Sequence, residues 1–304
     1  MDRELFLRPE TRADFLVDED RKRLWLCLLD MLECVASICD KYGLTYYLGG
    51  GTLLGAIRHG GIIPWDDDID IHLMRADYDR LQEILPKELP AHYFMQNSAT
   101  DPEYTITHVK IRDARYSAIP MYHVREHAVY NMGAFLDIFP LDGRAPTEKQ
   151  RNRQLRDLKW MKAFHKFAVM RKPRNIKQRV AAMFCRAIYR VIGANRFYRW
   201  RERVTARYGT DQEVLNLAIA EFGFRDWKKR IWLERTKKVP FEYLTCIVPE
   251  QSEETLTAQF GDWHQFVKGT GLHGEMVFDQ HKDFKTKLIE ECGYLNMDFQ
   301  NKPY

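Results

Sequence analysis

Residues 48–73 read LGGGTLLGAIRHGGIIPWDDDIDIHL, and this stretch limits the folds and the kinds of chemistry that are possible for the chain. Its second half contains Asp68-Ile69-Asp70-Ile71, which alternates acidic and apolar residues in the pattern of a strand with one buried face. Such a strand presents both carboxylates on one side and both isoleucines on the other. Its first half is a run of glycines leading into a short predicted helix, and the free backbone N–H groups of such a turn commonly bind phosphate.

The same stretch crowds four carboxylates into five residues: Asp66, Asp67, Asp68 and Asp70. Like charges at this spacing repel strongly unless a cation lies between them. An acidic pair on a strand is by itself most often solvated surface, but its combination with a phosphate-binding turn favours a metal–phosphate site. Oxygen ligands suit Mg²⁺ or Mn²⁺ rather than Zn²⁺. Asp137, in a later predicted strand, would complete a site for two such ions.

Around this stretch the chain alternates helical and strand patterns, which predicts an α+β fold. An amphipathic helix is expected over 19–41, with Gly43 as its stop, and another over 75–86. Strands are expected at 44–48, 68–71, 104–112 and 133–139, the last ended by Pro140, and a strand pair is expected near 231–248. From about 147 the pattern becomes helical and basic.

The sequence resembles the LicD family. The resemblance rests first on GGTLLGAIRHGGIIPWDDDIDI, residues 50–71, and then on VKIRD at 109–113 and FLDIFPLDG at 135–143. The segment FEYLTCIVPEQSEETLTAQFGDW, residues 241–263, is similar to the closing segment of the family. The basic middle stretch has no counterpart in the resemblance.

The resemblance implies a nucleotidyltransferase-like mixed β-sheet core flanked by helices, with a largely helical basic insertion. The catalytic core is then expected over 1–146, the insertion over 147–210, and a part that completes the catalytic domain over 211–304.

The resemblance also implies an enzyme: a metal-dependent phosphotransferase that moves a phosphate-linked group such as phosphocholine or an alditol phosphate. The donor would be CDP-activated, for example CDP-choline or CDP-ribitol. The acceptor would be a hydroxyl of a cell-surface glycan, lipopolysaccharide or teichoic-acid precursor. The alternative is a nucleotidyltransferase that attaches NMP to a small molecule or protein. A catalytically dead scaffold is disfavoured, because all three acidic positions are intact.

The motif and the expected phosphotransfer reaction together assign roles to individual residues. Asp68, Asp70 and Asp137 are the expected ligands of two Mg²⁺ or Mn²⁺ ions, and Asp137 is alternatively a base toward the acceptor hydroxyl. The expected donor- and phosphate-binding residues are Gly50, Gly51, Thr52, Arg58, Trp65, Lys110 and Arg112. For Lys110 and Arg112 the alternative is an ordinary surface cation on a half-buried strand, and for Trp65 it is core packing. No role is assigned to His72, His123 or His127, and the four-residue spacing of the last two lacks a third zinc ligand.

The positive charge of the chain is concentrated in one place. Residues 149–207 contain 19 Lys and Arg against two acidic residues, a net of +17, whereas the whole chain carries +4 and the remainder therefore −13. Within this stretch an apolar stripe runs from Val180 to Ile192 at helical spacing. Three interpretations stay open: docking on an anionic membrane surface, a solvated face or glycan acceptor site, and nucleic-acid binding, which lacks its usual recognition signatures.

The composition indicates the class of protein and its cellular compartment. The 304 residues are 45% apolar and 30% charged, which is typical of a soluble globular protein. No apolar run is long enough for a signal peptide or a membrane span. The six cysteines form no CxxC pair and are expected to be reduced thiols. We therefore expect a cytoplasmic protein, peripheral at the inner membrane face if the membrane interpretation holds.

Overall fold

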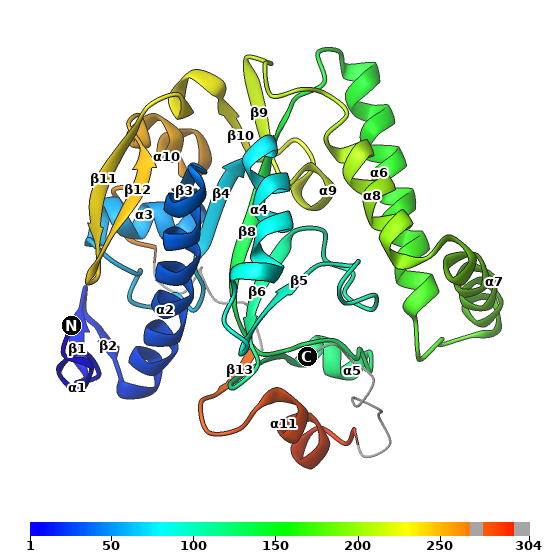
Figure 1. The fold of residues 1–304 in the computed structure, drawn as a ribbon, viewed down its shortest axis with the longest axis horizontal. Helices are drawn as coiled ribbons and strands as arrows, with labels where there is room; N and C mark the ends of the chain where they lie inside the picture. Colours follow the sequence, from blue (N-terminus) through cyan, green and yellow to red (C-terminus); the bar gives the residue numbers. More distant parts are fainter. Residues whose placement is uncertain (268–275, 295–304) are drawn as a thin grey trace.

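The computed structural model describes residues 1–267 and 276–294, and its centre is a mixed seven-stranded sheet (Figure 1). Five strands follow the order β10-β9-β8-β4-β3, while β6 pairs with β8 and β5 with β6. Only the β4–β8 pair is parallel among the pairs of this sheet. The strands are β3 (Tyr46–Leu48), β4 (Asp70–Met74), β5 (Tyr93–Gln96), β6 (Val109–Asp113), β8 (Ala134–Gly143), β9 (Val214–Leu217) and β10 (Trp227–Lys229).

Two helices pack against β8 on one face of this sheet, α2 (Glu19–Tyr42) and α4 (Arg75–Glu88) (Figure 1). Both were expected from the periodicity, and α2 ends at Gly43, whose φ of 64° lies in the left-handed region that glycine adopts without strain. Ile69, Ile71 and Ile138 point into the core beneath these helices. The acidic residues that alternate with them therefore lie on the opposite face of the sheet.

The central strand β8 does not end at Pro140, contrary to the expectation, but continues to Gly143. Its neighbour β6 pairs with it as far as Ile138, and β9 begins pairing at Leu141. Pro140 therefore falls in the gap between two partners on that edge, where its missing N–H breaks no ladder hydrogen bond.

The strand expected over 104–112 is also shorter, because β6 covers Val109–Asp113 only. Within the described chain, residues 104–108 belong to no strand; the backbone N–H of Tyr104 donates to Asp101, and Thr107 contacts α8 and α9 through its side chain and carbonyl. Val109 and Ile111, two positions apart on β6, both enter the core, as on a strand with one buried face.

The other elements surround the sheet. Helix α3 (Gly50–His59) packs against α10 (Ser252–Phe260) and against the hairpin of β11 (Thr236–Phe241) and β12 (Leu244–Pro249). This hairpin is the strand pair that was expected near 231–248. Its first strand begins at Thr236, and the residues before it form the 3₁₀ helix η1 (Arg230–Leu233). The smaller elements are α1 (Arg3–Phe6), β1 (Glu10–Arg12), β2 (Phe15–Val17), β7 (Ser117–Pro120), α5 (Met121–Arg125), α9 (Ile219–Phe222), β13 (Met276–Asp279) and α11 (Phe284–Glu291).

Three helices form a separate unit beside the sheet: α6 (Glu148–Val169), α7 (Ile176–Ile192) and α8 (Ala194–Thr205) (Figure 1). They share a hydrophobic cluster, distinct from the main core, that includes Leu158, Tyr189 and Phe197 and also Ile219 of α9. This helical unit matches the predicted helical character of the basic stretch, while the domain boundaries at 146 and 210 remain predictions. None of the helices in the described ranges is long and apolar enough to cross a membrane.

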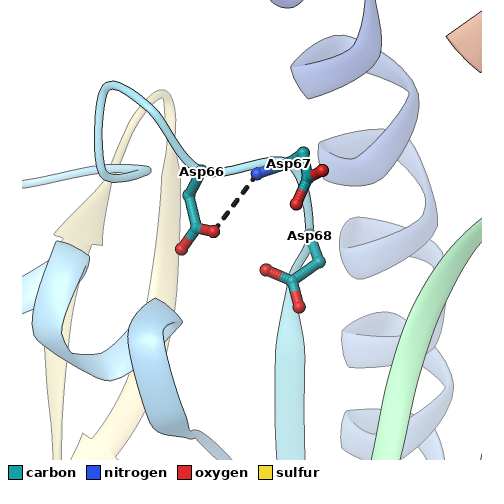
Figure 2. A group of neighbouring side chains, drawn as sticks. All are labelled: Asp66, Asp67 and Asp68. Carbon is teal, nitrogen blue, oxygen red and sulfur yellow. Dashed lines mark hydrogen bonds between the residues drawn. The ribbon is translucent and has the colours of Figure 1, made fainter. Parts of the chain in front are cut away.

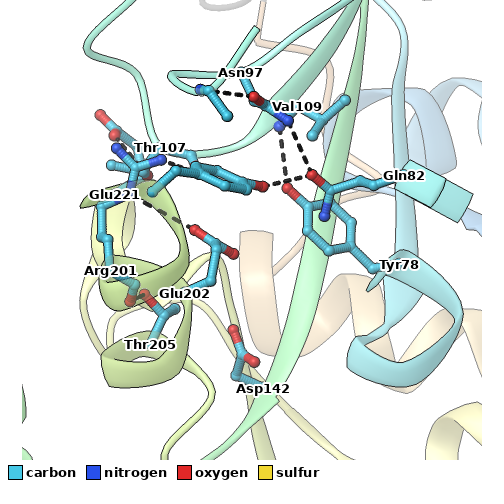
Figure 3. A network of polar contacts seen from close by, with 12 residues as sticks. Tyr78, Gln82, Asn97, Thr107, Val109, Asp142, Arg201, Glu202, Thr205 and Glu221 are labelled. Carbon is cyan, nitrogen blue, oxygen red and sulfur yellow. Dashed lines mark hydrogen bonds and ion pairs between the residues drawn. The ribbon is translucent and has the colours of Figure 1, made fainter. Parts of the chain in front are cut away.

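Polar contacts join the helical unit to the sheet (Figure 3). Arg201 of α8 donates to the carbonyl of Thr107, 3.4 Å away, and Tyr198 donates to Gln82 of α4. Tyr78 of the same helix accepts from the backbone N–H of Val109 at 3.2 Å. These bonds anchor the start of β6, and with it one wall of the acidic face.

Candidate active site

The sheet register brings three carboxylates together. In the parallel β4–β8 pair, Asp70 is the Cα partner of Asp137, and Lys110 of β6 is the partner of Asp137 on its other side. Asp68 lies just before β4. One carboxylate oxygen from each of Asp68, Asp70 and Asp137 lies within 4.8 Å of the other two. The expected proximity of Asp137 to the acidic pair is therefore found, across 67 positions of sequence.

A second acidic group shares one member with the first. Figure 2 shows Asp66, Asp67 and Asp68 around one turn of the chain. One carboxylate oxygen from each of them lies within 4.8 Å of those of the other two. The backbone N–H of Asp67 donates to Asp66 Oδ1 at 3.2 Å. Helix α2 holds this loop, because Arg21 and Trp25 both donate to the carbonyl of Asp66, at 2.9 and 3.1 Å. Asp68 thus lies between two candidate cation positions.

The electrostatics of these groups fit a divalent cation. Burial, followed by the negative charges of Asp68 and Asp137, raises the pKa of Asp70 well above its ordinary range. Burial and the charges of Asp68 and Asp67 do the same to the pKa of Asp66. Asp70 Oδ1 is buried and has no hydrogen-bond donor among the described residues. A buried carboxylate oxygen without a partner is costly, and a metal ion would satisfy it.

Asp137 has different surroundings. Lys110 Nζ lies 2.6 Å from its Oδ1 and 2.8 Å from its Oδ2, and His108 Nε2 donates to Oδ1 at 2.9 Å. Burial alone would raise the pKa of Asp137, but Lys110 and His108 hold it well below its ordinary range. A carboxylate kept this firmly ionised suits charge and ligand roles better than proton abstraction.

The glycine turn leaves room for the carboxylates. Gly50 begins α3 with a φ of 52°, and a Cβ there would lie 2.9 Å from Asp70 Oδ2. A Cβ on Gly51 would lie 2.9 Å from Asp66 Oδ2. Any larger residue would push these oxygens away. The helix start and the acidic cluster therefore face each other directly, as a site for a metal-bound phosphate requires.

Two cavities meet at Asp70. One has a volume of about 490 Å³ and is lined by Gly50, Gly51, Arg58, Trp65, Asp66, Asp68 and Asp70, together with residues of the segment 259–267. The other has a volume of about 390 Å³ and is lined by Gly50, Asp70 and His72 with the aromatic side chains of Phe139, Phe222 and Trp227. A group held at Asp70 is therefore accessible from two sides.

Arg58 and Trp65 contribute to the wall of the larger cavity in different ways. Arg58 Nη1 donates to the carbonyl oxygens of Trp263 and Gln265, at 2.8 and 3.3 Å, which ties α3 to the end of α10. Trp65 is only 3% exposed and packs its ring edge-on against Phe15. Trp65 therefore packs in the core, as the alternative expected, and also lines the cavity, while its role in donor binding stays a prediction.

Two predicted phosphate ligands, Thr52 and Arg112, have side chains that are engaged within the protein. The hydroxyl oxygen of Thr52 accepts the backbone N–H of Asp70 at 2.8 Å, so this side chain fixes the start of β4 and does not line either cavity. Arg112 is 1% exposed, and it donates to Gln96 Oε1 at 2.8 Å and to the Gly133 carbonyl at 2.7 Å. Arg112 is thus neither an ordinary surface cation nor part of the cavity walls.

The unassigned histidines fall into separate places. His72 is buried against Gly49, whose Cβ would lie 2.0 Å from its Nε2. His123 borders a further cavity of about 600 Å³ between α5 and α6. His127 lies beyond the end of α5 and stacks on Tyr294. In the described part of the chain, neither His123 nor His127 belongs to a cluster of metal-ligand side chains.

Sequence reasoning left two residues of this site without a role, His108 and Asp66. His108 lies two residues before Lys110, and the shared face that this spacing gives in an extended chain was the available signal that both could contact Asp137. Asp66 was counted among the four crowded aspartates but not assigned, because residues before a strand have no fixed direction. Its place in the second acidic group depends on the loop anchored by Arg21 and Trp25.

The segment that carries the three carboxylates of this site lies within a match to a known protein family. Residues 43–172 match a family model described as LicD/FKTN/FKRP, nucleotidyltransferase domain. The lipopolysaccharide cholinephosphotransferase LicD of Haemophilus influenzae is 39% identical over 120 residues, which are 39% of this chain and 43% of that protein. The ribitol 5-phosphate transferase FKRP of Homo sapiens is 42% identical over 57 residues, 19% of this chain and 12% of that protein. The matched segments span less than half the length of each of these relatives.

Proposed function

Residues 43–172 of this chain are a domain of the LicD family, and from that premise we propose that the protein is a metal-dependent phosphotransferase. It moves a phosphate-linked group, phosphocholine or a similar one, from a CDP-activated donor. The acceptor is a hydroxyl of a cell-surface glycan or teichoic-acid precursor. We further propose that its mixed sheet is the nucleotidyltransferase-like core implied by the family description.

One observation carries the proposal: three carboxylates from two segments far apart in the sequence converge within 4.8 Å opposite a glycine-rich helix start. The relatives that share this domain are named as transferases of choline phosphate and of ribitol phosphate. Both transferred groups contain a phosphate ester, so the shared domain supports phosphate-linked transfer more strongly than either headgroup.

Asp68, Asp70 and Asp137 would hold one Mg²⁺ or Mn²⁺ ion, and Asp66, Asp67 and Asp68 would hold a second. Bound there, such ions would neutralise the charge of the diphosphate and of the leaving phosphate. Lys110 keeps Asp137 ionised and adds a positive charge beneath the cluster. Gly50 and Gly51 present the N-terminal end of α3 to the phosphate oxygens.

In the reaction, the acceptor hydroxyl attacks the distal phosphorus of the donor, the P–O bond to CMP breaks, and CMP leaves. Such transition states are loose, so positioning and charge neutralisation dominate over proton abstraction. The hydroxyl proton is lost late and solvent in the cavity receives it. This is consistent with the surroundings of Asp137, whose two oxygens are both occupied by cationic or N–H groups.

The two cavities that meet at Asp70 suit a two-substrate transfer. The larger one lies along α3 and would take the nucleotide, with Arg58 and Trp65 in its wall. The smaller one, with Phe139, Phe222 and Trp227, would take the headgroup or the acceptor. Aromatic faces bind quaternary ammonium groups, so a choline headgroup fits this wall.

The test is product analysis by mass spectrometry with a panel of CDP-linked donors and a glycan acceptor, with Mg²⁺ and with EDTA. We expect CMP release and an acceptor heavier by the phosphate-linked group, with turnover lost in EDTA and restored by Mg²⁺ or Mn²⁺. Undiminished turnover in EDTA would contradict the metal assignment.

The second candidate is a nucleotidyltransferase, which the description of the matching domain favours. That reaction would attach NMP to the acceptor and release pyrophosphate from a nucleoside triphosphate. Mass spectra of the same assay with nucleoside triphosphates added to the donor panel distinguish the two, because the acceptor then carries the nucleotide. Transfer of NMP without transfer from any CDP-linked donor would replace the first proposal with this one.

A further inference from the structure

Helix α7 carries apolar side chains that the protein leaves uncovered. Val180, Met183, Phe184 and Val191 are 54%, 67%, 66% and 85% exposed. The helix lies at the edge of the molecule farthest from β11 and β12 (Figure 1). These residues belong to the apolar stripe seen in the sequence, and a contiguous exposed stripe of this kind marks an interaction surface.

The two faces of α7 show that this exposure is directional. Ala182, Cys185 and Tyr189 contact the hydrophobic cluster of the helical unit or are buried beside it. At 100° per residue, Val180 and Phe184 point about 160–200° away from Ala182, which is the opposite side. Helix α7 therefore has a packed inner face and an apolar outer face.

Positive charge flanks the outer face. Helix α7 contains no acidic residue, and the side chains of Lys177, Arg179 and Arg190 make no hydrogen bond or ion pair with other residues in the described ranges. A hollow of about 500 Å³ beside the outer face is lined by Arg171, Arg179, Arg186 and Arg190 with Met183, and none of its described lining residues is acidic. This combination forms a cationic rim around an apolar strip.

We propose that the outer face of α7 docks on the surface of an anionic phospholipid bilayer. The helix lies parallel to the surface, with Val180, Met183, Phe184 and Val191 at the boundary between headgroups and acyl chains. Arg179 and Arg190, at the edge of the hollow, contact lipid phosphates. A helix with an apolar face and a basic flank is the form that binds such an interface.

Charge decides against one other occupant of this face, and the apolar strip decides against a second. A second copy of this chain related by a two-fold axis would bring identical arginine-rich faces together, and their like charges would repel. A nucleic acid would match the arginines but would leave the aliphatic side chains of Val180, Met183 and Val191 against phosphates and sugars. An anionic bilayer satisfies both the charge and the apolar strip, and this assignment does not depend on the chemistry of the active site.

The experiment is co-sedimentation of the full chain with vesicles of phosphatidylcholine alone and of equimolar phosphatidylcholine and phosphatidylglycerol. We expect binding to the mixed vesicles at ~50 mM salt, at least ~10-fold weaker binding to the neutral ones, and a marked loss at ~500 mM salt. Absence of binding to the mixed vesicles at low salt, or equal binding to both kinds, overturns the proposal.

Two variants separate the charge from the apolar strip. Lys177→Gln/Arg179→Gln/Arg190→Gln should weaken binding roughly 10–100-fold, since each basic residue near the surface contributes to the attraction. Phe184→Gln/Val191→Gln keeps the charge and should weaken binding roughly 10-fold through lost apolar contact. If the second variant binds like the parent, the protein adsorbs to any polyanion and the proposed insertion is wrong.

The matched control variants carry their substitutions on surfaces away from α7. Lys87→Gln/Lys237→Gln/Lys238→Gln removes the same charge from exposed positions on α4 and β11, and Leu16→Gln/Ile231→Gln removes exposed apolar side chains elsewhere. Both should bind vesicles within ~2-fold of the parent. Equal losses in these controls would overturn the assignment to α7. So would light scattering showing a dimer of the parent chain that Phe184→Gln/Val191→Gln dissociates.

Discussion

Asp70 and Asp137 are partners across two parallel strands, yet their surroundings move the pKa values of the two carboxyls in opposite directions. Burial and neighbouring carboxylates raise the pKa of Asp70, whereas Lys110 and His108 hold that of Asp137 low. The cluster therefore keeps one permanent anion and one carboxylate whose charge is costly without a cation. A substitution in this cluster should therefore change both metal binding and the stability of the protein.

Replacement of Asp70 tests this link. Asp70→Asn should lower turnover at least ~10³-fold, because a ligand that positions transition-state charge neutralisation is lost. The same change removes a repelled buried carboxylate, so thermal unfolding in EDTA should occur at an unchanged or higher temperature. Mg²⁺ should raise the unfolding temperature of the parent protein more than that of Asp70→Asn.

The control for that change is Asp40→Asn, at an exposed position on α2, which should keep both turnover and the metal effect. Near-parental turnover in Asp70→Asn, or a clearly lower unfolding temperature in EDTA, would refute the assignment of Asp70.

Gly50 offers a second residue-scale test, with a matched control at Gly60, directly after the other end of the same helix. Gly50→Ala and Gly60→Ala both place a Cβ on a left-handed backbone, with φ of 52° and 67°, and each should cost about 1–2 kcal/mol of stability. Only at Gly50 does the Cβ also approach Asp70 Oδ2, at 2.9 Å. Gly50→Ala should therefore lower Mg²⁺ affinity at least ~10-fold, by calorimetric titration, while Gly60→Ala leaves it unchanged. Equal affinities would show that the turn does not shape the site.

At the scale of single elements, the local sequence pattern predicted where helices and strands occur better than it predicted where they end. The helices over 19–42, 75–88 and 176–192 follow from apolar periodicity that packing reinforces. The end of β8 at Gly143 could not be predicted, because Pro140 is tolerated only where β6 stops and β9 has not begun. That gap is a property of three strands distant in sequence, which no local pattern contains.

Helix α6 contains a histidine that should make stability depend on pH. Burial lowers the pKa of His165 to about 4, and its Nε2 donates to the Pro102 carbonyl at 2.9 Å. Below about pH 6.5 the unfolded chain gains a proton that the folded chain does not, so stability should fall as pH falls from about 6.5 to about 4. The slope from this one group is at most about 1.4 kcal/mol per pH unit.

Urea unfolding at several pH values measures this slope. His165→Gln should reduce the slope between pH 6.5 and 4, although His59, with a pKa lowered to about 4 by burial, keeps part of it. His281→Gln, at an exposed position, should leave the slope unchanged. An unchanged slope in His165→Gln would mean that this histidine is charged in the folded protein.

At the scale of the whole molecule, one arginine joins the sheet to the helical unit. Arg75 of α4 pairs with Asp142 of β8 through two 2.7 Å contacts and with Glu202 of α8 at 2.8 Å. Arg75→Met leaves the fully buried Asp142 without its cation and should destabilise the protein by about 3–5 kcal/mol. Amide hydrogen exchange in α8 should accelerate more than in α2.

A surface ion pair provides the comparison for Arg75. Arg3→Met breaks the exposed pair with Asp30 and should cost less than about 1 kcal/mol. If both substitutions cost the same, Arg75 is not the anchor of the helical unit.

The site as a whole was only partly predictable from the sequence. Asp68, Asp70 and the glycine turn share one local motif, so their proximity follows from the residues between them. The approach of Asp137 was expected from its place in a later acidic strand and from the family resemblance, but its position opposite Asp70 requires the register of β4 against β8. The anchoring of Asp66, and the burial of Arg112 under Gln96 and Gly133, depend on tertiary contacts with no sequence signature.

The position of β8 between β4, β6 and β9 also sets an order of assembly during translation. Strands β4, β6 and β8 are all synthesised by Gly143, but Leu141–Gly143 find their partner β9 only about 70 residues later, after α6–α8. At roughly 5–20 residues per second, the ribosome needs several seconds to supply it. The carboxylate cluster can therefore form on the nascent chain before its cavity is walled by residues 259–267, the last described part of that wall to be made.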